Sequence, residues 1–407
     1  MHLRQLFLAH VAQTSDFPLA LDIIKAEGMY LHDRDGKSYL DLISGIAVSN
    51  IGHRHPKVVD AIKHQVDQYL HTLVYGEFIH SPQVRLAHAL AATLAPFPTA
   101  TDEVLDQVYF TNSGTEAVEG AMKLAKRFTR KTEIVACEKS YHGSTQGALS
   151  LGEEEFRRPF RPLLPGIRKI RRNEPDTLDV ITQQTAAVII EPIGGEMGAV
   201  PTDFEFLQAI SARCREVGAL LIFDEIQSGF GRTGTFWAFE PSGVVPDILL
   251  TAKGMGGGMP IGAFIAPARI MGVLKNQPVL GHITTFGGHP VSCAASLATL
   301  ETIFQENLLA TVAEKEACFR SSLTHPLIRE VRGKGLQLAL VLDHFTQLKA
   351  VIDEALRHGV LTDWFLYCDY ALRIAPPLII SEEEIKMACS VIEQAIEKYA
   401  SLAYTRQ

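Results

Sequence analysis

Residues 219–227, ALLIFDEIQ, and residues 247–254, DILLTAKG, decide the fold of this chain. In each stretch a short apolar run leads to a charged side chain, Asp224 in the first and Lys253 in the second. Such continuous runs are typical of strands in parallel sheets, which are covered on both faces. The carboxyl ends of parallel strands meet at one edge, where α/β proteins build ligand sites. The two stretches therefore predict that Asp224 and Lys253 face one site.

The same pattern recurs through the middle of the chain. Apolar runs alternate with amphipathic stretches typical of helices, at 115–128 and 203–217, and this alternation predicts a mostly parallel α/β sheet. The further runs are VYFT (108–111), EIVAC (133–137), AAVII (186–190) and IGAFIA (261–266). Residues 28–41 instead alternate between apolar and polar around Asp35-Gly36, which predicts a hairpin outside the main sheet.

The last part of the chain has a different texture. After about residue 290 it becomes helix-rich, with strand-like runs LQLALVL (336–342) and LRIA (372–375) and helical stretches at 346–358 and 381–400. A chain of 407 residues also exceeds what one hydrophobic core usually serves. We therefore expect an α/β protein with two domains. Residues 51–290 would form a large domain with a mostly parallel sheet flanked by helices, and residues 291–407 a smaller α+β domain that residues 1–50 join.

The composition narrows the class of protein. Lys and Arg number 38 against 46 Asp and Glu, and the formal net charge of −8 argues against nucleic acid or an anionic membrane surface as a partner. No stretch approaches the ~18 apolar residues of a membrane span, and residues 1–13 are too polar for a secretory segment. The six cysteines are scattered without a CxxC pair, as expected of reduced thiols in a cytoplasmic protein. No metal site is expected.

Residues 112–117, NSGTEA, lie between an apolar run and a predicted helix. Gly114 and the first helical residues would point their backbone N–H groups at one spot, which forms an anion site. The alternative is an ordinary capping box, with Ser113 as the helix cap and Glu116 three residues later. These residues alone leave both interpretations open.

Two rival interpretations concern the charged residues and their surroundings. Asp224 and Lys253 could form a surface salt bridge, but GMGGGMP (254–260) lets backbone approach a bulky ligand, which a solvated charge does not require. Gly229–Gly234 matches GxGxxG, the dinucleotide fingerprint of an oxidoreductase. However, TFWAFEP follows where a helix should begin, and Asp247 opens a strand instead of ending one, so the context disfavours a nucleotide site.

Taken together, these segments resemble the class III, ornithine/acetylornithine-type, pyridoxal-phosphate-dependent aminotransferases of fold type I. The resemblance spans nearly the whole chain and keeps the family's order and approximate spacing. The matching segments are GHRHPKVVDAI (52–62), TNSGTEAVEGAMKLA (111–125), SYHG (140–143), IIEPIGGEMG (189–198), LIFDEIQSGFGRTG (221–234), TAKGMGGGMPIGA (251–263), TTFGGHP (284–290) and LRIAPPL (372–378). The GxGxxG match then becomes part of the family's own segment.

The resemblance implies pyridoxal 5'-phosphate as the cofactor and gives the site residues their roles. Lys253 would hold the cofactor as a Schiff base and then shuttle a proton between carbon atoms. Asp224 would pair with the pyridine nitrogen and keep it protonated. Tyr141 would stack on the ring, unless it is a buried core tyrosine. The other implied cofactor-binding residues are Ser113, Gly114 and Thr115 at the phosphate, Ile226 on the second ring face, Gln227 at the ring hydroxyl, His142 and Glu191. Thr285 is expected to reach the phosphate from a neighbouring subunit, which implies a homodimer.

Arg373 resembles the arginine that grips the α-carboxylate of glutamate or 2-oxoglutarate. Its alternative role is that of a surface cation. Glu196 resembles the acid that masks this arginine when a substrate without an α-carboxylate binds. The resemblance therefore implies an amino donor and a 2-oxo acid acceptor, with 2-oxoglutarate as the expected acceptor.

Two positions depart from the family pattern. Ser144 stands where acetylornithine, ornithine and bacterial 4-aminobutyrate enzymes usually have an arginine for a distal carboxylate, and a lost charge-assisted contact of about 1.5–3 kcal/mol changes specificity. Ile46 stands where ornithine δ-aminotransferases have a tyrosine. Without these anchors the pocket suits a donor whose distal end is uncharged or apolar, such as an ω-amine. His289 replaces the family's usual asparagine, which we interpret as a helix-cap substitution.

Other functions stay open at this point. An acetylornithine- or succinylornithine-type aminotransferase would need another residue to bind the distal carboxylate, for example from 71–80. An aminomutase or a decarboxylating transaminase would use the same lysine and aspartate. A regulatory protein that binds the cofactor without catalysis is disfavoured because Lys253, Asp224 and Arg373 are all present.

Overall fold

A seven-stranded sheet forms the centre of the computed structural model, which describes residues 3–404. The strand order is β4-β12-β11-β10-β7-β5-β6, and all neighbours run parallel except β12, which is antiparallel to β4 and β11. The strands are β4 (Gln107–Thr111), β5 (Glu133–Cys137), β6 (Ile167–Ile170), β7 (Thr185–Ile190), β10 (Leu220–Asp224), β11 (Ile248–Thr251) and β12 (Gly262–Ala266). Every apolar run expected in this sheet is therefore a strand of it. Only β6, whose IRKI mixes charged and apolar residues at the sheet's edge, is additional.

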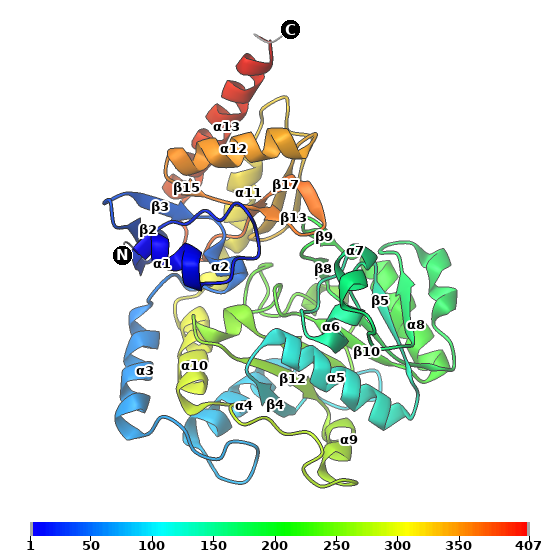
Figure 1. Cartoon of the computed structure of the whole chain (residues 1–407). Helices are drawn as coiled ribbons and strands as arrows, with labels where there is room; N and C mark the ends of the chain where they lie inside the picture. The colour runs from blue at the N-terminus through cyan, green and yellow to red at the C-terminus, as the bar shows by residue number, and fades with distance from the viewer. Residues whose placement is uncertain (1–2, 405–407) are drawn as a thin grey trace.

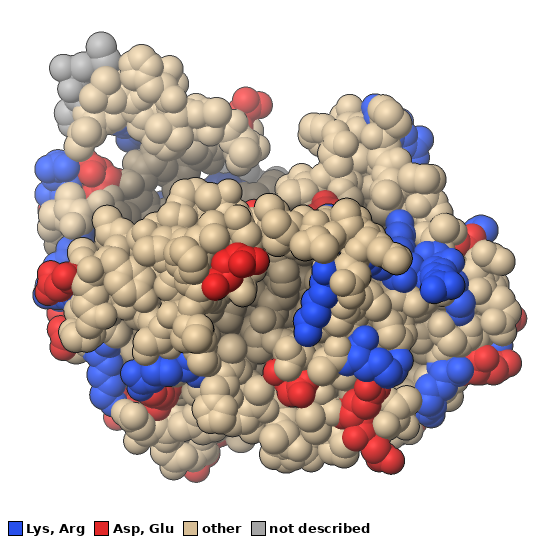
Figure 2. All heavy atoms as spheres, turned by 90° about the horizontal axis from the view of Figure 1, so that it is seen from below, with Lys and Arg blue, Asp and Glu red and all other residues tan. Residues whose placement is uncertain are grey.

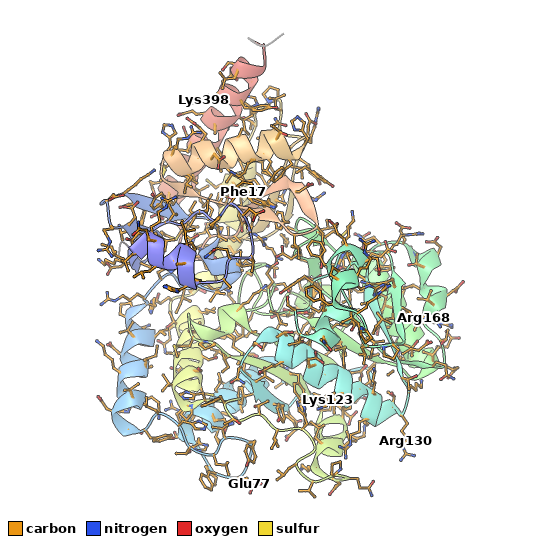
Figure 3. The ribbon with its side chains drawn as sticks, in the orientation of Figure 1. Phe17, Glu77, Lys123, Arg130, Arg168 and Lys398 are labelled. Carbon is orange, nitrogen blue, oxygen red and sulfur yellow. The ribbon has the colours of Figure 1, made fainter. Side chains whose placement is uncertain are left out.

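Both faces of this sheet are buried, which explains the continuous apolar runs. Ile222 of β10 lies in one hydrophobic core, with residues of α5 (Gly114–Thr129), whereas its neighbour Phe223 lies in a second core on the opposite face. Lys123 and Arg130 point away from the sheet on the outer side of α5 (Figure 3). The second core is shared with α3 (Pro56–Gln68), α4 (Ser81–Leu94), α8 (Phe204–Val217) and α10 (Pro290–Gln305). Shorter helices along this part of the chain are α6 (Gln146–Ser150), α7 (Glu154–Arg157) and α9 (Ala268–Met271).

A second packed unit lies above the large sheet in Figure 1 and contains both ends of the described chain. A third core joins Met29, Leu40 and Leu42 to residues between 312 and 396. Its elements are the sheet β13-β14-β17-β16, the sheet β1-β2-β3-β15 and three helices. They are β1 (Ile23–Glu27), β2 (Tyr30–Asp33), β3 (Ser38–Asp41), β13 (Glu330–Lys334), β14 (Gln337–Val341), β15 (Val360–Leu361), β16 (Trp364–Phe365), β17 (Cys368–Ile374), α11 (Val312–Ser322), α12 (Phe345–Arg357) and α13 (Glu382–Tyr404).

The N-terminal hairpin expected at residues 28–41 is present as β2 and β3, outside the large sheet. Strand β15 runs parallel to β3, with Val360 opposite Leu40, and this pairing ties the two ends of the chain together. The domain boundaries at 50/51 and 290/291 stay predictions. Because α10 buries Cys293, Leu300 and Ile303 in a core of the large sheet, its packing favours a boundary after α10 over one before it.

Four further features of the described residues concern membrane helices, metal ligands, cysteines and surface charge. Within residues 3–404, no helix combines the length and apolarity that a membrane crossing needs, and no group of three His, Cys, Asp or Glu side chains could hold a metal ion. All six cysteines are free thiols, five of them buried. Figure 2 shows Lys and Arg interspersed with Asp and Glu on the face seen from below.

Candidate active site

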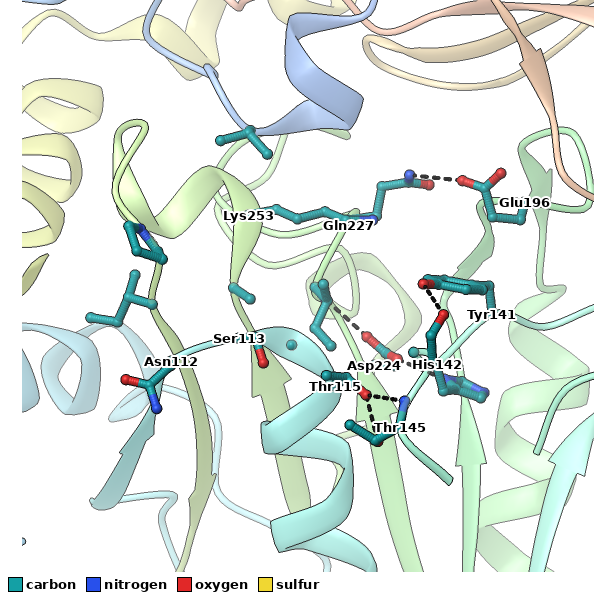
Figure 4. Close-up of a pocket in the computed structure, with 18 of the residues that line it drawn as sticks. Asn112, Ser113, Thr115, Tyr141, His142, Thr145, Glu196, Asp224, Gln227 and Lys253 are labelled. Atoms are coloured by element: carbon teal, nitrogen blue, oxygen red, sulfur yellow. Dashed lines mark hydrogen bonds and ion pairs between the residues drawn. The ribbon is translucent and has the colours of Figure 1, made fainter. Parts of the chain in front are cut away.

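The two charged residues that the strand pattern singled out do lie at one edge of the large sheet. Strand β10 ends at Asp224, and Lys253 follows the parallel neighbour β11 by two residues. Both line a cavity of about 650 Å³ at this edge, here called the cofactor cavity (Figure 4). Ser113, Thr115 and Tyr141 also contribute to its wall, so with Asp224 and Lys253 four separate segments of sequence converge here.

One end of the cofactor cavity is the N-terminus of α5. Half of the expected capping box is present, because the Glu116 N–H donates to Ser113 Oγ at 3.3 Å, whereas Glu116 Oε2 accepts from the Asn112 N–H at 2.7 Å and not from the Ser113 N–H. The cap does not close the anion site, since Ser113, Gly114 and Thr115 all line the cavity. The free N–H groups of a first helical turn favour a bound anion.

Two glycines keep this end open. Gly143 has a φ of +130°, and a Cβ there would overlap the Thr115 hydroxyl. A Cβ on Gly114 would lie 2.8 Å from Ile226 Cδ1. Any larger residue would therefore push the backbone or its neighbours into the cavity.

Asp224 is held in a fixed orientation at the cavity floor. Its Oδ2 lies 2.6 Å from Nδ1 of the buried His142, and its Oδ1 accepts from the Ile226 N–H at 3.0 Å. His142 Nε2 is buried and forms no hydrogen bond within the described residues. The histidine thus acts on Asp224, whereas the sequence interpretation had implied only that it binds the cofactor.

Lys253 reaches the cavity from a strained backbone. Its φ is +43°, in the left-handed region that non-glycine residues seldom adopt, and it opens the short 3₁₀ helix η4 (Lys253–Gly256). Such strain is found where the surrounding structure enforces a functional geometry. Burial lowers the pKa of Lys253 below its ordinary value, although nearby Glu196 opposes the shift. No dashed contact joins its amine to the other residues drawn in Figure 4.

A second cavity, of about 630 Å³, adjoins the first and is called the outer cavity here. The two share six lining residues: Tyr141, His142, Gly143, Ser144, Glu196 and Lys253. Ile46 and Ser144, the two positions that depart from the family pattern, both line the outer cavity. Ile46 is carried there by the single turn α2 (Ser44–Ala47), whose four residues have φ between +46° and +64°. A left-handed turn costs roughly 1–2 kcal/mol per non-glycine residue, so the packing around it must enforce this shape.

Arg373 lines the outer cavity within a cluster of three charges, of which Glu196 lines both cavities. Its Nη1 and Nη2 each lie 3.0 Å from Glu196 carboxylate oxygens, and its Nε lies 2.8 Å from Asp363 Oδ1. Arg373 is 4% exposed, which excludes the surface-cation alternative. Burial raises the pKa of Glu196, but the Arg373 guanidinium outweighs burial and lowers it to about 2. Burial likewise lowers the pKa of Arg373, and Glu196 and Asp363 raise it above its ordinary value.

Comparison with known proteins places this geometry in a family. The chain matches the family model described as aminotransferase class-III over residues 11–396. The chain belongs to the class III aminotransferases.

Known relatives agree with this placement. The acetylornithine aminotransferase of Bacillus subtilis is 39% identical over 389 residues, which cover 94% of this chain and 96% of the relative. The ornithine aminotransferase structure from Toxoplasma gondii matches with a TM-score of 0.88 at 29% identity, over 97% of this chain and 93% of that one. An amine transaminase from an uncultivated Pseudomonas species matches with a TM-score of 0.86 at 28% identity, over 96% and 98%. This class III aminotransferase is therefore a pyridoxal-phosphate-dependent enzyme, as the resemblance implied.

The residues present fit that cofactor. The glycine-shaped end of the cavity offers helix N–H groups to a phosphate, and any Cβ at Gly143 would fill the space. Asp224 offers a buried carboxylate at the floor, and Lys253 offers an amine of lowered pKa opposite. The buried His142 Nε2 and Glu191 Oε2 form no hydrogen bond within residues 3–404, so polar capacity remains around the cavity.

Gln227 and Glu191, both predicted from the sequence, make hydrogen bonds near the cluster of Arg373, Glu196 and Asp363. Gln227 donates to Glu196 Oε1 at 3.4 Å and accepts from Gln337 Nε2 at 3.0 Å. Glu191 Oε1 accepts from the Gly195 N–H at 3.1 Å, and burial raises the pKa of Glu191. Gln337 comes from the second unit, and nothing in its sequence neighbourhood indicated this contact.

Two of the residues named from the sequence do not contact the cavities of this chain, and three residues near the cavities were not predicted. Thr285 is exposed and lines neither cavity of this single chain. His289 occupies the N-cap position of α10 as expected, but its side chain makes no capping hydrogen bond and instead stacks on His71 at 5.5 Å between ring centroids. Asp363, Phe156 and Tyr367 reach the site although the sequence interpretation missed them. Only the position of Asp363 before the predicted run LRIA could have drawn attention to it.

Proposed function

We propose that this enzyme transfers an ω-amino group from an amine or amino acid donor to a 2-oxo acid. The ion pair between Glu196 and Arg373 carries the proposal. A donor that presents an ω-amine has no α-carboxylate beside the reacting carbon, so Glu196 keeps Arg373 neutralised. A 2-oxo acid has that carboxylate, which competes with Glu196 for the two Nη groups. One site can thus accept both substrates in turn, with 2-oxoglutarate expected as an acceptor.

The residues that line the cofactor cavity would each contact a different part of the cofactor. Ser113, Gly114 and Thr115 would bind the phosphate, with Tyr141 and Ile226 on the two ring faces. Asp224, fixed by His142, would keep a proton on the pyridine nitrogen, because a buried carboxylate favours a positive partner. Gln227 would approach the ring hydroxyl, and Glu191 would support that side of the cavity. Pyridoxal phosphate, when bound, supplies the electron-withdrawing ring that makes the proton on the amine-bearing carbon removable.

Lys253 would hold the cofactor and move the proton. Its lowered pKa increases the fraction of neutral amine near neutral pH, and only a neutral amine can accept a proton. Its place between Asp224 and the Glu196–Arg373 pair puts it within reach of both cavities.

The enzyme would act as a homodimer in the cytoplasm. Thr285 is exposed, and Val279, Ile283 and Phe286 around it are also exposed in the single chain. An apolar segment left in water is typical of a surface that a partner covers. A second copy of the chain would bury this segment and bring Thr285 to the phosphate of the neighbouring site.

An acetylornithine aminotransferase is the second candidate. Relatives with this name are about 39% identical over nearly the whole chain, which favours it. Against it stands Ser144, which offers a distal carboxylate no positive charge. Assays of N-acetylornithine against simple amines separate the two candidates.

The proposal is tested with the variant Arg373→Ala. Two charge-assisted hydrogen bonds of about 1.5–3 kcal/mol each are lost, so kcat/KM for 2-oxoglutarate and pyruvate should fall at least about 100-fold. The bound cofactor should remain visible in the absorption spectrum. Arg329→Ala is the control, because Arg329 is an exposed arginine paired with Asp343 far from the cavities. Unchanged kinetics with both acceptors in Arg373→Ala would refute the proposed role. An aminomutase would need no acceptor at all.

A further inference from the structure

We infer that the outer cavity receives the distal end of the substrate as hydrocarbon, so that the natural donor is a primary amine with an aliphatic or aromatic tail. This inference rests on the proposed function and names its substrate class. The donor carbon would be oxidised from amine to aldehyde or ketone, while the keto carbon of the 2-oxo acid is reduced to an amine. The overall exchange needs no other reactant.

Each charged side chain that lines the outer cavity already has an ion-pair partner or a role at the reacting end of the substrate. Among the described lining residues the charged side chains are Glu196, Lys253 and Arg373, and the histidine, His142, holds Asp224 through Nδ1. Lys253 serves the reacting end, and Glu196 and Arg373 neutralise each other at 3.0 Å. Arg373 also holds Asp363 through Nε. No cation among the described lining residues is left for a carboxylate at the far end of a donor.

Two arginines near Phe156 and Phe160, outside the lining, are also engaged, whereas Arg158 between them is exposed and lines neither cavity. Arg157 lies 2.9 Å from Glu154 and donates to the Ser150 carbonyl at 3.1 Å. Arg161 shares the same acid, Glu154, at 2.7 Å. These pairs tie the arginines to α7 itself, although Phe156 of the same helix faces the cavity.

Apolar side chains from four segments form most of the remaining wall. They are Ile46, Leu149, Phe156, Phe160, Leu366 and the ring of Tyr367. Phe160 is 59% exposed and Leu366 41% exposed. Phe156 meets the Tyr367 ring edge to face, with centroids 5.2 Å apart. Uncovered apolar groups that converge on a cavity gain free energy when a ligand removes them from water.

The polar groups on this wall stay neutral. The Tyr141 hydroxyl and Ser144 Oγ lie 3.1 Å apart and hydrogen-bond to each other. Burial raises the pKa of Tyr367, so its phenol keeps its proton. A carboxylate placed here would lose its hydration without gaining a positive partner. A hydrocarbon tail would lose nothing.

The first experiment compares two donors that differ only at the far end, hexylamine and 6-aminohexanoate, with pyruvate as acceptor and the holoenzyme as catalyst. We expect kcat/KM to be at least about tenfold higher for hexylamine, because one charged contact is worth about that factor. Equal or better turnover of 6-aminohexanoate would overturn the inference. A separate binding measurement uses hexan-1-ol, which cannot be deaminated. Calorimetry should show it binding the holoenzyme more tightly than 6-hydroxyhexanoate, and the reverse order would also overturn the inference.

The second experiment places a cation in the wall. Ser144→Arg should reverse the preference between the two donors, whereas Ser144→Met, a neutral side chain without the charge, should not improve 6-aminohexanoate. If both variants favour 6-aminohexanoate equally, charge is not the determinant and the inference fails. L-Alanine, assayed with 2-oxoglutarate as the acceptor, separates this failure from failure of the proposed function, because it tests amino transfer beside an α-carboxylate and its short side chain needs no distal site. An enzyme that converts neither amine nor alanine would refute the proposed function itself.

Discussion

The cofactor cavity and the outer cavity share six lining residues but differ in what shapes them. The cofactor cavity is shaped by backbone, with glycines where a Cβ has no space and a helix N-terminus at its end. The outer cavity is shaped by side chains, several of them apolar and partly exposed. Backbone shape tolerates little change, whereas exposed side chains can be exchanged without disturbing the fold. The comparison indicates that chemistry is fixed at one end of this site and specificity is adjustable at the other.

The largest effect should come from Lys253, which lines both cavities. Lys253→Ala removes the group that would hold the cofactor and move the proton, and we expect turnover to fall at least about 10⁴-fold. The measurement is single-turnover kinetics with L-alanine, together with borohydride reduction and mapping of the labelled residue. Lys63→Ala, an exposed change on α3, is the control. Covalent labelling at another lysine in the native enzyme would contradict the assignment.

A smaller effect tests the rigidity of the cofactor cavity. Gly143→Ala introduces a Cβ that overlaps Thr115 at a φ of +130°, so we expect cofactor affinity to fall about 100-fold, of the order of 3 kcal/mol. Equilibrium dialysis against pyridoxal phosphate measures this loss. Gly272→Ala is a matched control, because nothing lies within 4 Å of its Cβ position and its φ is not in the left-handed region. Equal affinity in the two variants would show that the cavity is not shaped as described.

Sequence alone predicts the cofactor end better than the outer end, for the same physical reason. Residues at the ends of β10 and β11 are placed by the sheet, so short apolar runs sufficed to bring Asp224 and Lys253 together. The sequence did not predict strand β6, because two of its four residues are charged. Such residues are tolerated in a strand at the sheet's edge.

The positions of the residues at the outer cavity depend on packing between the large-sheet unit and the second unit. No local sequence pattern encodes that packing. Asp363 meets Arg373 across paired strands, and Gln337 reaches Gln227 from the other unit. Phe156 and Tyr367 touch each other from positions far apart in the chain. The family resemblance supplied Glu196 and Arg373, but it could not supply side chains in which this chain departs from the family.

Glu196→Gln gives the smallest change in rate and tests the group that joins the cavities. Arg373 would keep Asp363 at Nε but lose the carboxylate that covers its two Nη groups, so these N–H donors would face the donor substrate without their anionic partner. We expect kcat/KM for hexylamine to fall about tenfold and the KM for pyruvate to fall, because the acceptor no longer competes with Glu196. Steady-state kinetics with each substrate varied in turn measures both effects. Glu382→Gln, which alters an exposed ion pair on α13, should change neither.

The same variant has a pH-dependent effect on stability that a glutamate without an ion-pair partner would lack. The pKa of Glu196 is about 2 in the folded enzyme, below its ordinary value of 4.5. A lowered pKa contributes stability that is fully present above pH 4.5 and is lost as the pH falls from about 4.5 to about 2. Glu196→Gln should therefore be less stable than the native enzyme at pH 7, by roughly 3 kcal/mol for a broken buried pair. The gap should narrow by about 1 kcal/mol at pH 3.5. Urea unfolding of the cofactor-free proteins measures the gap, and a constant gap at both pH values would show that Glu196 is not held as an anion by Arg373.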